Sequence, residues 1–384
     1  MTVSNLLIYI IKSAISSQEI KINQQEVDWE ALYQLADYHS VANYLVYAMT
    51  ADTPAVYREK AQKAYSLSMV RSAKYDMENA LTFNAFEENG ISYMPLKGYY
   101  MKKYYPSPEM RTMCDIDVLI KKDEVEKVED VMSSLGYLNK DLDRSDQITY
   151  DKPPLCSYEM HLNLVSPTHK IIGGYYMDPW RFAKKDEDNS YGYHMSDEDF
   201  FIFQLAHYTK HYTTCGVGIR PVIDIFLFMK HFKDKLDWSY IDAQLDKMCM
   251  KAFCHKVIEL GEYWFGEGEA DETVLAIAKQ TMSSGIYGND TMIATTKTMK
   301  AKNPVVYKIK KAFTIAFPRR KAMEHIFPTL KKHPYLLPFF WIKRLLVKIF
   351  TGKGNEYLAS QDNSAEENSK NIRSHFDSVG LGDF

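Results

Sequence analysis

Asp115 and Asp117 are separated by one residue within the apolar segment MCDIDVLI (113–120). Side chains two positions apart on a β-strand point to the same face, so both carboxylates would project together. Two adjacent like charges destabilise a fold unless a cation lies between them. The flanking residues are typical of a buried central strand. The pair therefore predicts a divalent-cation site, and a solvated edge strand is the alternative interpretation.

A third acidic residue, Glu159, lies in another alternating segment, SYEMHLNLV (157–165). His161 shares its face, where an imidazole can orient a metal ligand. Three carboxylates can hold two Mg²⁺ ions about 4 Å apart, which act on both the attacking and the leaving oxygen of a displacement at phosphorus. We therefore expect Asp115, Asp117 and Glu159 to be catalytic metal ligands for phosphoryl transfer.

Short apolar segments and one amphipathic helix surround these acidic residues. Asp123 and Glu126 have the spacing of a helix capping box, and Gly136 is placed to end that helix. The predicted strands are residues 91–97, 113–120, 136–142 paired antiparallel with 147–152, and 157–165. The order of strands and helices predicts a small α/β or α+β core.

The rest of the chain has helical periodicity. A break is expected near Pro54, a helix end at Gly90, and a helix start at Ser196 with Asp199. The predicted organisation is an N-terminal helical region (1–88), the catalytic core (89–195), a helical domain covering the site (196–300), a basic helical segment (301–352) and a polar, disordered tail (353–384).

Four segments in this order resemble a bacterial group of uncharacterised nucleotidyltransferases of the DNA polymerase β-like superfamily. They are PLKG, RTMCDIDVLI, a helix ending in LGY, and YEMHLNL, and the match extends over about residues 91–224. The resemblance implies an α+β fold with a minimal palm-like mixed sheet, flanked by helical regions. It also implies that Asp115 and Asp117 bind the metals and that Glu159 is the third catalytic carboxylate.

The chain departs from the superfamily pattern at the phosphate-binding turn. Most members have a Gly-Gly or Gly-Ser pair at a helix start, whereas this chain has Lys97-Gly98. An ammonium is a good point charge for phosphate, so Lys97 is predicted to replace the serine. Arg111 is a second candidate phosphate ligand, with a surface ion pair as the alternative.

His207 and His211 are four residues apart on a predicted helix and share a face. The resemblance suggests that such histidines lie near the nucleotide. The alternatives are a zinc site, which lacks the Glu of HExxH, and two histidines bonded to buried carbonyls. Arg220 and Asp224 have the spacing of an ion pair on a helix surface or between domains.

Taken together, these residues predict Mg²⁺-dependent transfer of a nucleoside monophosphate from an NTP, with ATP among the candidate donors, to a hydroxyl acceptor. The sequence does not identify the acceptor, and the candidates are a small molecule, a sugar, a protein or an RNA end. The alternative is a catalytically weak nucleotide- or partner-binding module. A net charge of −3 does not indicate nucleic-acid binding, and five cysteines without a CxxC pair favour a reducing cytoplasm.

Residues 335–350 are strongly apolar and contain the basic residues Lys343, Arg344 and Lys348. The segment is too short and too charged to span a bilayer. We expect it to pack on the protein's own helices, with snorkelling lysines. The alternative is a peripheral helix on an anionic membrane.

Overall fold

A computed structural model describes residues 1–140, 146–285, 327–350 and 371–382, together with single positions between 286 and 326. The chain forms two compact units. The larger comprises residues 1–212, 216–288 and 379–384, and the smaller comprises residues 213–215 and 289–378. The larger unit contains the predicted N-terminal helical region and catalytic core, together with residues 196–212 and 216–288 of the predicted covering domain. The other residues of that domain, 213–215 and 289–300, belong to the smaller unit.

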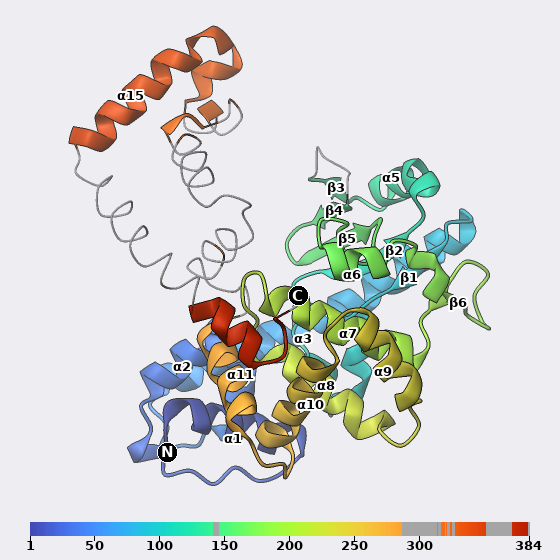
Figure 1. The fold of residues 1–384 in the computed structure, drawn as a ribbon. Helices are drawn as coiled ribbons and strands as arrows, with labels where there is room; N and C mark the ends of the chain where they lie inside the picture. The colour runs from blue at the N-terminus through green and yellow to red at the C-terminus, as the bar shows by residue number, and fades with distance from the viewer. Residues whose placement is uncertain are drawn as a thin grey trace. The chain divides into compact units, whose positions relative to one another are not determined.

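The N-terminal part is helical, as expected, with a long helix that begins after Pro54. Thr2 and Asp28 cap the first two helices through their side chains. Gly90 follows the third with a φ of +66°, a conformation that favours glycine. The α-helices are α1 (Val3–Ile15), α2 (Trp29–Tyr38) and α3 (Ala55–Glu88), and the 3₁₀ helices are Gln24–Glu26 and Ala42–Ala48. α1 also packs against α10, from much later in the chain (Figure 1).

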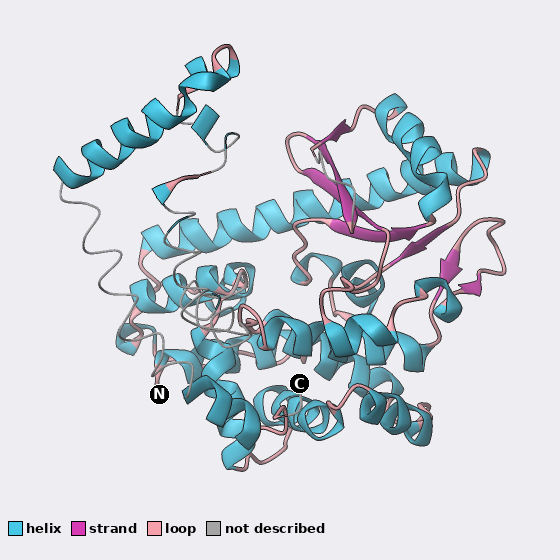
Figure 2. Ribbon diagram, turned by 45° about the horizontal axis from the view of Figure 1, so that its top comes forward, coloured by secondary structure: helices cyan, strands magenta, loops and turns pink. Residues whose placement is uncertain are grey.

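A five-stranded mixed sheet forms the centre of the catalytic region, which confirms the predicted α+β class (Figure 2). Its strand order is β1-β2-β5-β4-β3, where β2 pairs parallel with β5 and the other neighbours pair antiparallel. The strands are β1 (Tyr93–Pro95), β2 (Ile116–Ile120), β3 (Leu138–Asn139), β4 (Gln147–Lys152) and β5 (Cys156–His161). Because β2 lies inside the sheet, the edge-strand interpretation is wrong.

The two faces of the sheet differ as the alternation predicted. One face packs on α3 and α5 (Val125–Ser134) through apolar side chains: Ile116, Val118, Tyr158, Met160, Tyr75, Phe83, Phe86 and Val128. In the parallel register Asp117 is opposite Glu159. The other face therefore carries the acidic residues.

The connection between β2 and α5 differs from the expected capping box. The 3₁₀ helix Lys122–Glu124 precedes α5. Glu124 is the N-cap residue of α5, but its side chain makes no capping hydrogen bond to that helix. The Glu124 carboxylate instead accepts from the Ser92 N–H at 2.8 Å. The prediction that Asp123 and Glu126 cap this helix is therefore wrong, whereas Gly136 ends it with a φ of +84°.

Further helices follow the sheet. The Ser196 hydroxyl accepts from the Asp199 N–H at 3.1 Å and begins α7, as predicted. The elements are α4 (Gly98–Met101), α6 (Lys170–Tyr175), β6 (Lys184–Lys185), β7 (Tyr193–His194), α7 (Asp197–Tyr212), α8 (Arg220–Phe232), α9 (Trp238–Lys247), α10 (Lys251–Phe265) and α11 (Glu272–Ser283). Short 3₁₀ helices are Lys102–Tyr104, Pro108–Met110 and Pro179–Phe182.

The smaller unit contains α15 (Leu337–Phe350), preceded by the 3₁₀ helices Pro328–Lys331 and Pro334–Leu336. Trp341 Nε1 donates to Pro318 O at 2.9 Å, whereas Phe339 and Ile342 are 61% and 58% exposed. Within the described residues, no helix is long and apolar enough to cross a membrane. Residues 371–378 are helical, so the expected tail disorder is wrong there, and residues 353–370 lie outside the described part.

Candidate active site

Three polar side chains converge on the face of the sheet opposite α3. Asp117 lies in β2, Glu159 is its register partner in β5, and His161 follows two residues later. One potential ligand atom from each residue lies within 4.8 Å of the others. His161 Nε2 is 2.7 Å from Asp117 Oδ1 and 3.5 Å from Glu159 Oε2. The sequence-based expectation that Glu159 and His161 share the face of Asp117 is confirmed.

Asp115 precedes β2 and lines the same cleft. Burial, together with the negative charges of Asp117 and Glu159, raises the pKa of Asp115 to about 6. This is the behaviour expected of buried carboxylates that lie close together. Burial and the neighbouring carboxylates both favour the protonated form of Asp115.

Lys97 and His161 both contact the central carboxylate, Asp117. Lys97 Nζ is 2.6 Å from Asp117 Oδ1, the oxygen that His161 Nε2 also approaches. Burial alone would raise the pKa of Asp117, but the charge of Lys97 and the hydrogen bonds from both residues hold it well below its usual range. Burial lowers the pKa of His161, whereas its hydrogen bonds to Asp117 and Glu159 outweigh this and raise it. His161 thus acts as a donor toward the carboxylates.

An unusual turn positions Lys97. Its φ and ψ are +43° and −114°, and the Tyr99 N–H donates to Leu96 O at 3.2 Å. These angles match the first central position of a type II′ turn, where glycine is favoured. The following residue is constrained as well, because a Cβ on Gly98 would lie 2.6 Å from Met113 Sδ. The turn therefore carries backbone strain at the residue whose ammonium contacts Asp117.

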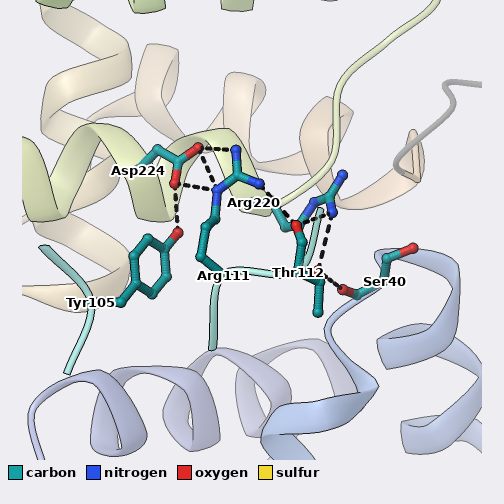
Figure 3. Close-up of polar contacts among 6 residues, drawn as sticks. All are labelled: Ser40, Tyr105, Arg111, Thr112, Arg220 and Asp224. Atoms are coloured by element: carbon teal, nitrogen blue, oxygen red, sulfur yellow. Dashed lines mark hydrogen bonds and ion pairs between the residues drawn. The ribbon is translucent and has the colours of Figure 1, made fainter. Parts of the chain in front are cut away.

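Arg111 forms a buried ion pair with Asp224 (Figure 3). Arg111 Nε and Nη2 lie 2.8 Å from Asp224 Oδ1 and Oδ2 respectively, and the Tyr105 hydroxyl donates to Oδ1 at 2.6 Å. Asp224 is only 4% exposed, so the expectation of a surface ion pair is wrong. Arg111 also lines the catalytic cleft, and its contact with phosphate stays a prediction.

Arg220 does not form the predicted ion pair with Asp224. Its Nη1 donates to Thr112 O at 2.7 Å and to Thr112 Oγ1 at 3.1 Å (Figure 3). The two residues share α8, but Asp224 is already bound by Arg111 from a distant part of the chain. Spacing along one helix could not reveal this competing partner.

Two neutral histidines from α7 line the cleft. The ring centroids of His207 and His211 are 4.4 Å apart. Burial, with the positive charges nearby, lowers the pKa of His211 to about 3 and that of His207 well below its usual value. His207 Nδ1 and Gln204 Nε2 are buried without a hydrogen-bond partner among the described residues. His207 Nδ1 therefore makes no bond to a buried carbonyl in the described structure, although the alternative of two histidines bonded to carbonyls is not tested for His211.

The cleft has a volume of about 320 Å³. It brings together the predicted residues Lys97, Gly98, Arg111, Asp115, Asp117, Glu159, His207 and His211. Gln204 and Arg220 also line it, and the sequence analysis did not assign either to the site. Gln204 lies one helical turn before His207 and shares its face of the helix, so the sequence could have indicated that Gln204 lies in the cleft. In the described part of the chain, the group whose potential ligand atoms lie close enough to hold a metal is Asp117, Glu159 and His161. It includes neither Asp115 nor the pair His207 and His211, so a metal contact of Asp115 stays a prediction.

Comparisons with known proteins agree with this geometry. Residues 25–266 match a family model described as "Uncharacterised nucleotidyltransferase". This range covers most of the larger unit and contains every residue of the cleft. No curated protein matches the chain, and no solved structure matches it.

Proposed function

The chain belongs to the family of uncharacterised nucleotidyltransferases, and from this premise we propose that it transfers a nucleoside monophosphate from an NTP to a hydroxyl acceptor with the help of Mg²⁺. The observation that carries the proposal is the pairing of Asp117 with Glu159 across two parallel strands, with Asp115 in the same cleft. Several carboxylates that line one cleft are suited to hold the divalent ions that assist phosphoryl transfer.

The residues present fit Mg²⁺. Asp115, Asp117 and Glu159 offer the oxygen atoms that this ion prefers, and the raised pKa of Asp115 reflects negative charge that burial leaves without enough compensation. When bound, Mg²⁺ would polarise the phosphoryl group and stabilise the charge that develops on it. His161 would orient Asp117 through the hydrogen bond seen at 2.7 Å.

Other residues of the cleft suit the remaining tasks. Lys97, which lies next to Asp117, would contact the phosphates of the donor nucleotide. Glu159, which is less buried than Asp117, would accept the proton of the acceptor hydroxyl. Gln204 and His207 would offer polar atoms to the nucleotide, since each has a buried nitrogen without a partner in the described structure.

A second candidate function rests on the contact between Lys97 and Asp117. An ammonium 2.6 Å from the central carboxylate already supplies a positive charge there. A nucleotide-binding module of the same fold, with weak or no catalysis, would need no metal ion to keep this arrangement. The two functions differ in their response to Mg²⁺.

Melting curves with and without Mg²⁺ separate the two proposals. A ligand that binds only the native state raises the melting temperature. Wild-type protein should be stabilised by Mg²⁺, while Asp115→Asn and Glu159→Gln should respond less. An equal Mg²⁺ response of wild type and Asp115→Asn would rule out the metal assignment.

A further inference from the structure

A second cavity adjoins the catalytic cleft. Its volume is about 190 Å³, and its lining includes Ser68, Arg71, Ser72, Arg111, Thr112 and Arg220. Arg111, Met113, Cys114 and Arg220 line both this cavity and the cleft that contains Asp115. The two spaces therefore share a wall.

Positive charge exceeds negative charge in this cavity. Arg111 is neutralised by Asp224, but neither Arg71 nor Arg220 is in an ion pair with any residue that the structure describes. The carboxylate that lines the cavity is that of Asp37, which is exposed. Two arginines thus face a small cavity without a paired anion.

Each arginine retains donor capacity. Arg71 Nε is buried without a hydrogen-bond partner in the described structure, and Arg71 Nη1 makes only a long contact of 3.4 Å with Met113 O. The hydrogen bonds of Arg220 use Nη1, both of them directed to Thr112. A buried guanidinium donor without an acceptor is costly, so such donors commonly face a ligand or an ordered water molecule.

One hydroxyl group of the cavity adds to this chemistry, because those of Ser68 and Thr112 already donate to backbone carbonyl oxygens. Ser72 Oγ accepts from Lys102 Nζ at 3.4 Å, so its own hydrogen can be donated elsewhere. Ser68 and Arg71 share the cavity-facing side of α3 with Ser72. Burial and the nearby charge of Arg111 lower the pKa of Arg220, as expected for a cation without full compensation.

We infer that this cavity is an anion site that binds a phosphate group, held by Arg71 and Arg220. Two forked guanidinium groups, with the Ser72 hydroxyl as a further donor, suit a tetrahedral dianion, which accepts several hydrogen bonds at once. The phosphate would belong either to the donor triphosphate or to a phosphorylated acceptor. The identity of the molecule that carries the phosphate rests on the proposed function. The binding of an anion in this cavity does not, because it needs no transfer reaction.

Calorimetric titration with inorganic phosphate and pyrophosphate, in the presence of EDTA, tests the site without any metal ion. Arg71→Gln and Arg220→Gln should each bind these anions about 10- to 100-fold more weakly than wild type, which is the usual loss for a charged hydrogen bond. Arg58→Gln is the matched control, because Arg58 lies exposed on the same helix and does not line the cavity. If Arg220→Gln fails to fold, Arg71→Gln still tests the site, because it removes the other proposed anion ligand.

Two further probes distinguish the sources of the phosphate. If the donor supplies it, Arg71→Gln should weaken the binding of ATP. If the acceptor supplies it, Arg71→Gln should weaken the binding of glycerol 3-phosphate and leave that of ATP unchanged. Binding of every anion by both variants with wild-type affinity would overturn the inference.

A separate control isolates the anion site from the proposed function. Glu159→Gln should respond less to Mg²⁺ than wild type and still bind phosphate with wild-type affinity. If wild-type protein binds phosphate but shows no response to Mg²⁺, this would contradict the proposed function and still support the anion site.

Discussion

Lys97 Nζ lies 2.6 Å from Asp117 Oδ1, so the protein itself supplies the cation that contacts its central carboxylate. The side chains are only 17% and 10% exposed, which makes this a buried pair. We propose that the Lys97 ammonium, which pairs with Asp117, would also contact the phosphates of a bound nucleotide. The proposed phosphate contact and the observed ion pair would then use the same side chain.

Substitutions of Lys97 test this account. Lys97→Ala and Lys97→Gly both remove the ammonium, so both should weaken nucleotide binding in titrations while leaving the fold intact. The φ of residue 97 is +43°, a conformation that glycine adopts more readily than alanine. The free energy of unfolding of Lys97→Gly should therefore be about 1 kcal/mol higher than that of Lys97→Ala. Nucleotide affinity equal to that of wild type in both variants would show that Lys97 does not bind phosphate.

The raised pKa of Asp115 predicts a dependence of stability on pH. The pKa of Asp115 in the native protein, about 6, lies above its ordinary value of 3.8, so the native state binds this proton more tightly than the unfolded state does. Protonated Asp115 therefore contributes stability that is complete below pH 3.8 and is lost as the pH rises through 6. Asp115→Asn has no such loss. In EDTA, the free energy of unfolding of Asp115→Asn minus that of wild type should therefore be about 2–3 kcal/mol larger at pH 7.5 than at pH 4.

Urea denaturation at the two pH values measures this difference. Arg58→Gln, which removes an exposed charge that does not change between these pH values, serves as a comparison. A constant difference between wild type and Asp115→Asn across this pH range would contradict the crowding of the three carboxylates.

The buried pair Arg111–Asp224 predicts a large loss of stability when one partner is removed. Arg111→Met leaves the Asp224 carboxylate buried with the Tyr105 hydroxyl as its remaining donor among the described residues, and should lower the free energy of unfolding by about 3–5 kcal/mol. Arg111→Met combined with Asp224→Leu should lose less, because no unpaired charge remains. Equal losses in the single and double variants would contradict a direct interaction.

Part of this site was predictable from local sequence. The alternation around Asp115 and Asp117 indicated a strand with both carboxylates on one face, and the same argument placed Glu159 beside His161. These patterns depend only on the period of a strand. The parallel pairing of β2 with β5, which sets Asp117 opposite Glu159, was not predicted from the residues, because register depends on contacts between distant segments.

The remaining site contacts join residues far apart in sequence. Asp224 pairs with Arg111 across 113 positions rather than with Arg220 four positions away. Asp123 and Glu126 had the spacing of a capping box, but the 3₁₀ turn before α5 moved the cap to Glu124. In each case a tertiary contact or a local turn prevailed over a pattern that would be favourable in an isolated helix.

The chain end provides a further prediction. Val379 and Leu381, at 2% exposure each, belong to the larger unit, and a Cβ on Gly380 would lie 3.2 Å from the Ala252 Cβ. Deleting residues 334–384 should therefore destabilise or aggregate the protein, and deleting only residues 379–384 should lower its melting temperature, since each buried large side chain contributes about 1.5–3 kcal/mol.

The double substitution Phe339→Ser and Ile342→Ser is the control for this deletion. Both side chains are exposed on α15, so the melting temperature should not change. Normal stability of the truncated protein, combined with loss of binding to anionic vesicles, would instead favour the membrane role of residues 335–350.

Transfer of label from nucleotide to acceptor tests the central claim most directly. The protein is incubated with Mg²⁺, cell extract and each common nucleoside triphosphate, labelled at either the α- or the γ-phosphate, alongside Asp115→Asn and Asp117→Asn. We predict that one triphosphate gives a labelled product from the α-position alone, and that both variants abolish it. Label transferred from the γ-position, or nucleotide binding without any α-label transfer, would contradict the proposed nucleotidyl transfer.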